Sequence, residues 1–122
     1  MFSLNDSMHY YLCPGFTDMR KGMCSLCGLV KNEMGKRLVN GDVFIFIGRS
    51  RRQIKLLHAE DGGLVMYVKR LEAGRFRLPE YDETSGCYQM EWCDLVMMVA
   101  GIKENPAQRL RRLRAERKVY SI

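Results

Sequence analysis

The residues of this chain that could bind a metal or carry out redox chemistry are cysteines, and two of them form the motif Cys24-Ser25-Leu26-Cys27. A redox pair of this spacing usually opens a helix that follows a strand, whereas this pair falls inside a predicted helix. Zinc would need two further ligands, and Cys87 and Cys93 are separated by five residues, which is wider than the usual two to four. We therefore expect buried, reduced thiols and no metal, because free cysteine is commonly a small core residue.

Acid–base and nucleophilic chemistry finds little support in the sequence. The two histidines, His9 and His58, fall in predicted strands, far from any serine or cysteine that spacing would select as a nucleophile. Asp42, Asp61 and Asp94 form no recognisable metal-binding set, and the sequence has no glycine-rich motif of the phosphate-binding type. We expect histidines that are either hydrogen-bonded or exposed, no catalytic residues, no cofactor and no enzymatic activity.

Positive charge is the feature that points to a partner. The chain has 122 residues and a formal net charge of +6. Residues 103–118 hold seven basic and two acidic residues, which leaves 13 basic and 12 acidic residues in the body. A nearly neutral body with a basic C-terminal segment favours an anionic partner, of which nucleic acid is the commonest. The tail residues that we expect to contact DNA are Arg109, Arg111, Arg112 and Arg114.

A second group of basic residues lies in the body of the chain. The stretch "GRSRRQIKLL" (residues 48–57) places three arginines directly after the apolar run "VFIFI". A solvated turn would tolerate arginine equally well, so these residues form a contact surface only if they share a face with the tail. The predicted nucleic-acid-binding residues of the body are Arg20, Lys21, Arg49, Arg51, Arg52, Lys55, Lys69 and Arg70.

Several strands are predicted to position these residues. Residues 8–13 form a first short strand, and four further stretches suggest an antiparallel meander. The run "VFIFI" has the composition of a strand that is buried on both faces. In the last stretch, "RFRLP", Arg75 and Arg77 would lie on one face and Phe76 and Leu78 on the other. The meander strands are residues 43–47, 53–59, 64–70 and 75–79.

Helices are predicted on either side of the meander. An apolar stripe indicates a helix that is capped by Thr17 and stops at Gly35, with Arg20 and Lys21 unfavourably placed in its first turn. Residues 79–90 are predicted as a loop, and helical spacing returns between residues 92 and 102. Asn105-Pro106 would cap a third helix, which has too thin an apolar stripe to be firmly buried.

These elements predict an α+β fold, with an antiparallel sheet of about four to five strands packed by two helices and a basic C-terminal tail that is helical or disordered. We expect one domain over residues 1–103 and a basic extension over residues 104–122. The longest apolar runs fall short of the roughly 18 to 20 residues that a membrane helix needs, so we expect a cytoplasmic protein.

Several stretches, taken in order, resemble a known family. They are "TDMRKG" (residues 17–22), "GDVFIF", "IKLLH", "GGLVMYVKRLEAGRFRLP" and the "GI" that ends the second predicted helix, and the match as a whole covers roughly residues 2 to 103. The sequence resembles the TnpB accessory protein, also called the Orf2-like protein, of the IS66 family of bacterial insertion sequences. The chain departs from the family pattern at Met23-Cys24, where an aromatic-acidic pair is usual, and at Ala59, where tryptophan is expected. These departures weaken any assignment of contacts to the first helix.

The resemblance implies a small protein that is encoded beside a separate transposase, assists transposition and has no established catalytic activity. It differs from the much larger RNA-guided nuclease that shares the name TnpB. Together with the charge distribution, the resemblance predicts a non-catalytic accessory factor that binds DNA, the ends of the insertion sequence among the candidates, and works with the transposase. The alternative is a protein-interaction module, in which the sheet or a Met97-Met98 surface docks on the transposase without touching DNA.

Overall fold

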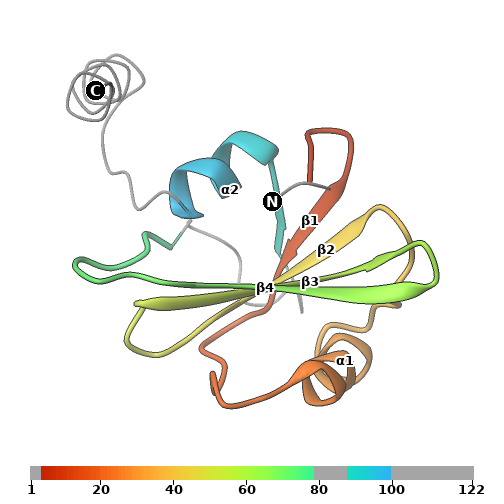
Figure 1. The fold of residues 1–122 in the computed structure, drawn as a ribbon, viewed down its shortest axis with the longest axis horizontal. Helices are drawn as coiled ribbons and strands as arrows, with labels where there is room; N and C mark the ends of the chain where they lie inside the picture. Colours follow the sequence, from red (N-terminus) through yellow and green to blue (C-terminus); the bar gives the residue numbers. More distant parts are fainter. Residues whose placement is uncertain (1–3, 79–87, 100–122) are drawn as a thin grey trace, which may run out of the picture.

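A computed structural model describes residues 4–78 and 88–99 of the chain. A five-stranded sheet forms the centre, with one helix on each of its faces (Figure 1). No helix in the described residues is long and apolar enough to cross a membrane. In chain order the elements are β1 (His9–Leu12), α1 (Met23–Asn32), β2 (Asp42–Ile47), β3 (Gln53–Glu60), β4 (Gly63–Arg70), β5 (Tyr88–Met90) and α2 (Trp92–Val99).

The strands lie in the order β4-β3-β2-β1-β5. The run β2-β3-β4 is an antiparallel meander, as predicted, and β5 pairs antiparallel with β1. β1 instead runs parallel to β2, with His9 opposite Asp42, so the sheet is mixed and not wholly antiparallel. Parallel neighbours need a long crossover, which the segment that contains α1 supplies. The predicted α+β class is confirmed.

Strand β2 lies in the middle of the core, and its side chains supply both faces of the sheet. Phe44 and Phe46 are fully buried on the face that α1 covers. Val43, Ile45 and Ile47 are equally buried on the face that α2 covers. The prediction of a strand buried on both faces is therefore confirmed.

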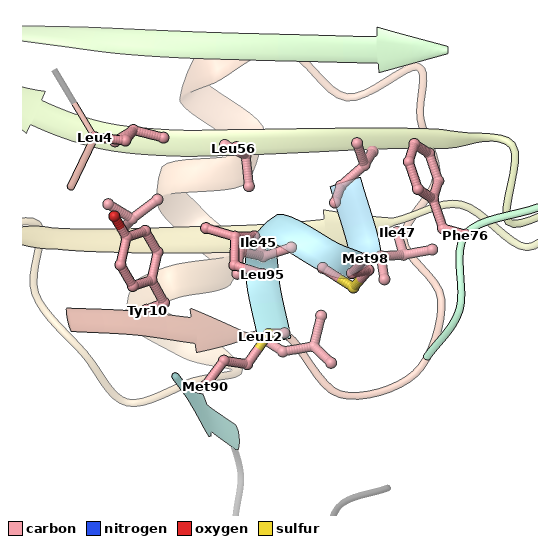
Figure 2. Close-up of a cluster of buried hydrophobic side chains, with 12 residues drawn as sticks. Leu4, Tyr10, Leu12, Ile45, Ile47, Leu56, Phe76, Met90, Leu95 and Met98 are labelled. Atoms are coloured by element: carbon pink, nitrogen blue, oxygen red, sulfur yellow. The ribbon is translucent and has the colours of Figure 1, made fainter. Parts of the chain in front are cut away.

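Helix α2 covers one face through Leu95 and Met98, which pack onto β1, β2 and β3 (Figure 2). Tyr10 lies in the same cluster, with its ring 5.5 Å from that of Trp92 and its hydroxyl donating to the Asn5 carbonyl oxygen. Burial raises the pKa of Tyr10 to about 12. Because Met98 is buried against the sheet, the predicted Met97-Met98 docking surface is wrong for that residue.

Helix α1 starts five residues later than predicted, at Met23, with Gly22 in place of Thr17 as its N-cap. Thr17 does not cap the helix but extends the pairing of β1 with β2, since the Thr17 N–H donates to the Ile47 carbonyl oxygen at 2.8 Å. Tertiary pairing has thus taken the residue that local sequence assigned to a helix. The predicted stop is confirmed, since Gly35 has a positive φ of 63°.

Residues 75–78 do not form the predicted fourth meander strand, and the three-residue strand β5 lies entirely within the predicted loop. The alternation of the "RFRL" stretch nevertheless holds, because Phe76 is fully buried while Arg75 and Arg77 are exposed. Figure 2 shows Phe76 in the α2-face cluster near Ile47. The sequence therefore predicted which of these side chains are buried and which are exposed, but it did not predict the backbone pairing of the segment.

Candidate nucleic-acid interface

The arginine-rich stretch is the tight connection between β2 and β3. The Gly48 N–H donates to the Gln53 carbonyl oxygen at 3.1 Å, and the Arg51 N–H donates to the Gly48 carbonyl oxygen at 2.9 Å. Arg51 itself has a φ of 57°, in the left-handed region that non-glycine residues seldom adopt. This backbone leaves Arg49 and Arg52 exposed and Arg51 half-buried.

The segment that follows β4 is hydrogen-bonded to this turn. The Leu71 N–H donates to the Arg52 carbonyl oxygen at 2.7 Å, and the Phe76 N–H donates to the Arg51 carbonyl oxygen at 2.6 Å. Phe76 anchors the segment in the core. Its neighbours Arg75 and Arg77 are therefore held beside the turn between β2 and β3. Figure 1 shows the turn and the segment at the same end of the sheet.

This end of the sheet gathers basic side chains from sequence positions more than twenty residues apart. Arg70 adds to them, because it is exposed and opposite Gln53, the first residue after the turn. Lys69 is half-buried on the neighbouring position, and Glu72 is the acidic residue within the segment. We call the following set the basic end: Arg49, Arg51, Arg52, Arg70, Arg75 and Arg77.

The "TDMRKG" motif lies next to the start of the same turn. A Cβ on Gly48 would come within 2.6 Å of the Met19 Cγ, so the Met19 side chain covers this glycine. The Asp18 carboxylate accepts from the Arg20 guanidinium at 2.7 Å, and these hydrogen bonds hold the pKa of Asp18 well below its usual range. Arg20 is therefore exposed but carries a paired charge.

Lys55 does not reach solvent. Its residue is 7% exposed, and its Nζ donates to the Lys21 carbonyl oxygen at 2.8 Å on the α1 face. The Lys55 ammonium thus fixes the "TDMRKG" segment to β3 through the Lys21 carbonyl oxygen. The Lys21 residue is itself half-buried. Sequence alone gave no sign of this, because "QIKLLHA" does not alternate cleanly between polar and apolar residues.

Several predicted site residues lie outside the described part of the chain. These include the basic tail, the predicted third helix, the boundary between residues 103 and 104, and Cys87. Conversely, Arg75 and Arg77 were not in the predicted DNA-binding set, although the structure places them beside the turn. The signal that could have found them is the alternation around Phe76, which makes both arginines face outward.

The remaining reactive groups do not converge in the described residues. Cys24 is exposed and Cys27 half-buried, so the expectation of a buried pair is wrong for Cys24. Burial raises the pKa of the Cys27 thiol, and the neighbouring Cys24 raises it further. Within residues 4–78 and 88–99, no three His, Cys, Asp or Glu side chains are grouped to hold a metal ion.

His58 is 2% exposed, and its Nδ1 has no hydrogen-bond partner among the described residues.

Comparison with known proteins places this arrangement in a family. Residues 8–109 match the protein family described as "IS66 Orf2 like protein". The chain belongs to the IS66 Orf2-like family. Membership gives it an accessory role associated with an insertion sequence, in a family that is generally non-catalytic. The resemblance drawn from the sequence motifs is therefore confirmed.

Two relatives come from Sinorhizobium fredii. The uncharacterized protein y4hO is 28% identical over 102 residues, which cover 84% of this chain and 87% of the relative. The uncharacterized protein y4jC is 27% identical over 97 residues, which cover 75% of this chain and 81% of the relative. No solved structure matches the chain significantly. The IS66 Orf2-like match includes the whole basic end and stops at Arg109, so most of the basic tail lies beyond it.

Proposed function

We propose that the chain is a non-catalytic accessory factor for the transposition of its insertion sequence and that it binds DNA phosphates with the basic end. The observation that carries this proposal is the clustering of six arginines at one end of the sheet by two backbone hydrogen bonds, from Leu71 to Arg52 and from Phe76 to Arg51. Arginine is suited to phosphate because its planar guanidinium donates two parallel hydrogen bonds.

The basic end is arranged for contacts with the DNA backbone. Its side chains project from a tight turn, from the last residue of β4 and from an irregular segment, and none of these is a helix that could fill a major groove. Phosphate contacts position a protein on the duplex without reading its sequence. Binding should therefore depend strongly on salt and weakly on the base sequence, with the tail arginines adding further phosphate contacts.

Lys55 and Arg20 have a smaller part in this proposal than the sequence suggested. Lys55 is buried on a carbonyl oxygen, and Arg20 is paired with Asp18. Lys21, Lys69 and Arg70 stay in the proposed set, together with the turn arginines and Arg109, Arg111, Arg112 and Arg114. Arg75 and Arg77 are added to it because they lie beside the turn.

The test is the salt dependence of affinity for a duplex from an element end and for a scrambled duplex. Each phosphate contact contributes about −0.9 to the slope of log affinity against log salt. The double variant Arg75→Gln/Arg77→Gln should therefore flatten the slope by about 1.8 on both duplexes. Deleting residues 104–122 should flatten it by about 4 to 5, if the tail neutralises about five phosphates.

A matched control removes the same charge from elsewhere on the surface. Lys31 and Arg37 are both exposed; Lys31 is in the last turn of α1 and Arg37 is on the connection from α1 to the start of β2, so both lie away from the arginine turn. The variant Lys31→Gln/Arg37→Gln should leave the slope unchanged. If it flattens the slope as much as the basic-end variant does, the proposal of a defined DNA-contacting end is wrong. Retention on the transposase at high salt, without any DNA binding, would favour the alternative of an interaction module.

A further inference from the structure

Strand β4 is an outer strand of the sheet, and it carries exposed apolar side chains along its length. Among residues 4–78 and 88–99, its eight residues pair with β3 alone, on one side. Leu64, Val65 and Val68 are 39%, 38% and 46% exposed. A long apolar edge strand is a template for pairing with another chain, and proteins that stay monomeric usually shorten, charge or cover such edges.

The backbone of β4 presents its free hydrogen-bonding groups on alternate residues. Glu60 and Gly63 flank a two-residue turn, so their backbone N–H and C=O groups face each other as a hydrogen-bonded pair of the antiparallel ladder. The alternation along an antiparallel ladder then turns the N–H and C=O groups of Leu64, Met66 and Val68 away from β3. The side chains of these three residues all lie on the α1 face, because Met66 is opposite Leu57 of that cluster.

When two copies of β4 are paired antiparallel, apolar residues of one copy lie opposite apolar residues of the other. Two identical antiparallel strands are related by a two-fold axis perpendicular to the sheet, which keeps the same face on both copies. With the axis at Met66, Leu64 lies opposite Val68 of the second copy and Met66 lies opposite its counterpart, so the α1 face forms a continuous apolar row. On the other face, Val65 lies opposite Tyr67, a favourable pairing of a β-branched with an aromatic residue.

The charges at the two ends of β4 also favour this antiparallel arrangement. The strand begins after the acidic residues Glu60 and Asp61 and ends at the basic residues Lys69 and Arg70. Antiparallel pairing brings Lys69 and Arg70 of each copy beside the acidic turn of the other copy. Moving the axis to Tyr67 would instead place Lys69 opposite Val65, which interrupts the apolar pairs.

We propose that β4 pairs antiparallel with β4 of a second copy of this chain, around a two-fold axis at Met66, and joins two five-stranded sheets into one. The occupant of the edge is a second copy because both the apolar residues and the charges of β4 complement its own reverse. This assembly does not depend on the proposed DNA binding, although Lys69 and Arg70 take part in both, and it can be tested without DNA.

The first experiment measures the mass of the full chain by light scattering or sedimentation, from micromolar to submillimolar concentration. The unmodified protein should form a dimer as its concentration rises. Val68→Lys should raise the dimer dissociation constant at least about tenfold, because two symmetric apolar pairs are lost and a charge is placed at each site. Val39→Lys is the matched control, since Val39 is also 46% exposed but lies outside β4, and it should leave the constant unchanged.

The second experiment tests the register by disulfide cross-linking under mild oxidation. The proposed axis places position 66 opposite itself, at a Cα separation of about 5.5 Å that a disulfide can span. Met66→Cys should therefore form a covalent dimer well above the background of the unmodified protein, and Tyr67→Cys should not. A monomer at every concentration, a dimer unaffected by Val68→Lys, or stronger cross-linking at position 67 would each overturn the proposal.

Discussion

The substitution His58→Leu is expected to stabilise the protein. His58 lies in β3 between Val43 and Val65 of the neighbouring strands, and it is 2% exposed. Within the described residues its Nδ1 is buried without a hydrogen-bond partner. A buried polar group that makes no hydrogen bond costs about 1 to 3 kcal/mol, whereas an apolar side chain of similar volume carries no such cost.

The size of the effect follows from this balance. Leucine removes the cost at Nδ1 but also removes any hydrogen bond made by Nε2, which is worth about 1 kcal/mol. We therefore expect a net gain of about 1 kcal/mol in the free energy of unfolding, or about 4 °C in melting temperature. Urea denaturation should show a higher midpoint with an unchanged slope, because the surface exposed on unfolding hardly changes.

The matched control uses the other histidine. His9 is exposed in β1, so His9→Leu should change the free energy of unfolding by less than about 0.5 kcal/mol. If His58→Leu lowers stability by more than this control does, the imidazole makes a stabilising contact and the reasoning from its unpaired nitrogen is refuted.

Three further predictions concern other buried contacts. Tyr10 should titrate near pH 12 when followed by ultraviolet absorbance. Because its pKa is raised above 10.0, its contribution to stability should be complete below pH 10 and lost as pH rises towards 12. A titration midpoint near pH 10 would contradict the burial of Tyr10. Gly48→Ala should destabilise the fold by about 1 to 3 kcal/mol, measured by urea denaturation, because the added Cβ meets the Met19 side chain. The same substitution should cost less in a Met19→Ala background, and equal costs in both backgrounds would rule out that contact. Lys55→Met should change the free energy of unfolding by less than Lys55→Ala, because methionine keeps the buried stem; the reverse order would show that the ammonium contributes more than the stem does.

Local sequence patterns predicted most of the elements in this fold. The run "VFIFI", the two strands after it and helix α2 appear as expected, because each is defined by neighbouring apolar residues. The start of α1 was wrong because Thr17 pairs with Ile47, thirty residues away. The parallel pairing of β1 with β2 was missed for the same reason, since it depends on which strands meet and not on their composition.

The candidate site was predictable in part. The turn arginines follow from a short motif, but their grouping with Arg75 and Arg77 depends on two backbone hydrogen bonds between distant segments. The burial of Lys55 had no sequence signal, because a lysine in a strand is expected to reach solvent. Long-range contacts therefore decide which basic residues belong to the proposed interface.

The position of β1 in the sheet has a consequence for protein synthesis. β1 is translated before the other strands of this sheet, yet it lies between β2 and β5, so that Tyr10 pairs with both Val43 and Met90. Its second neighbour is translated about eighty residues later, and until then one of its edges stays open. A chain that terminates early, before residue 88, would keep this open edge permanently and should be prone to aggregation and proteolysis.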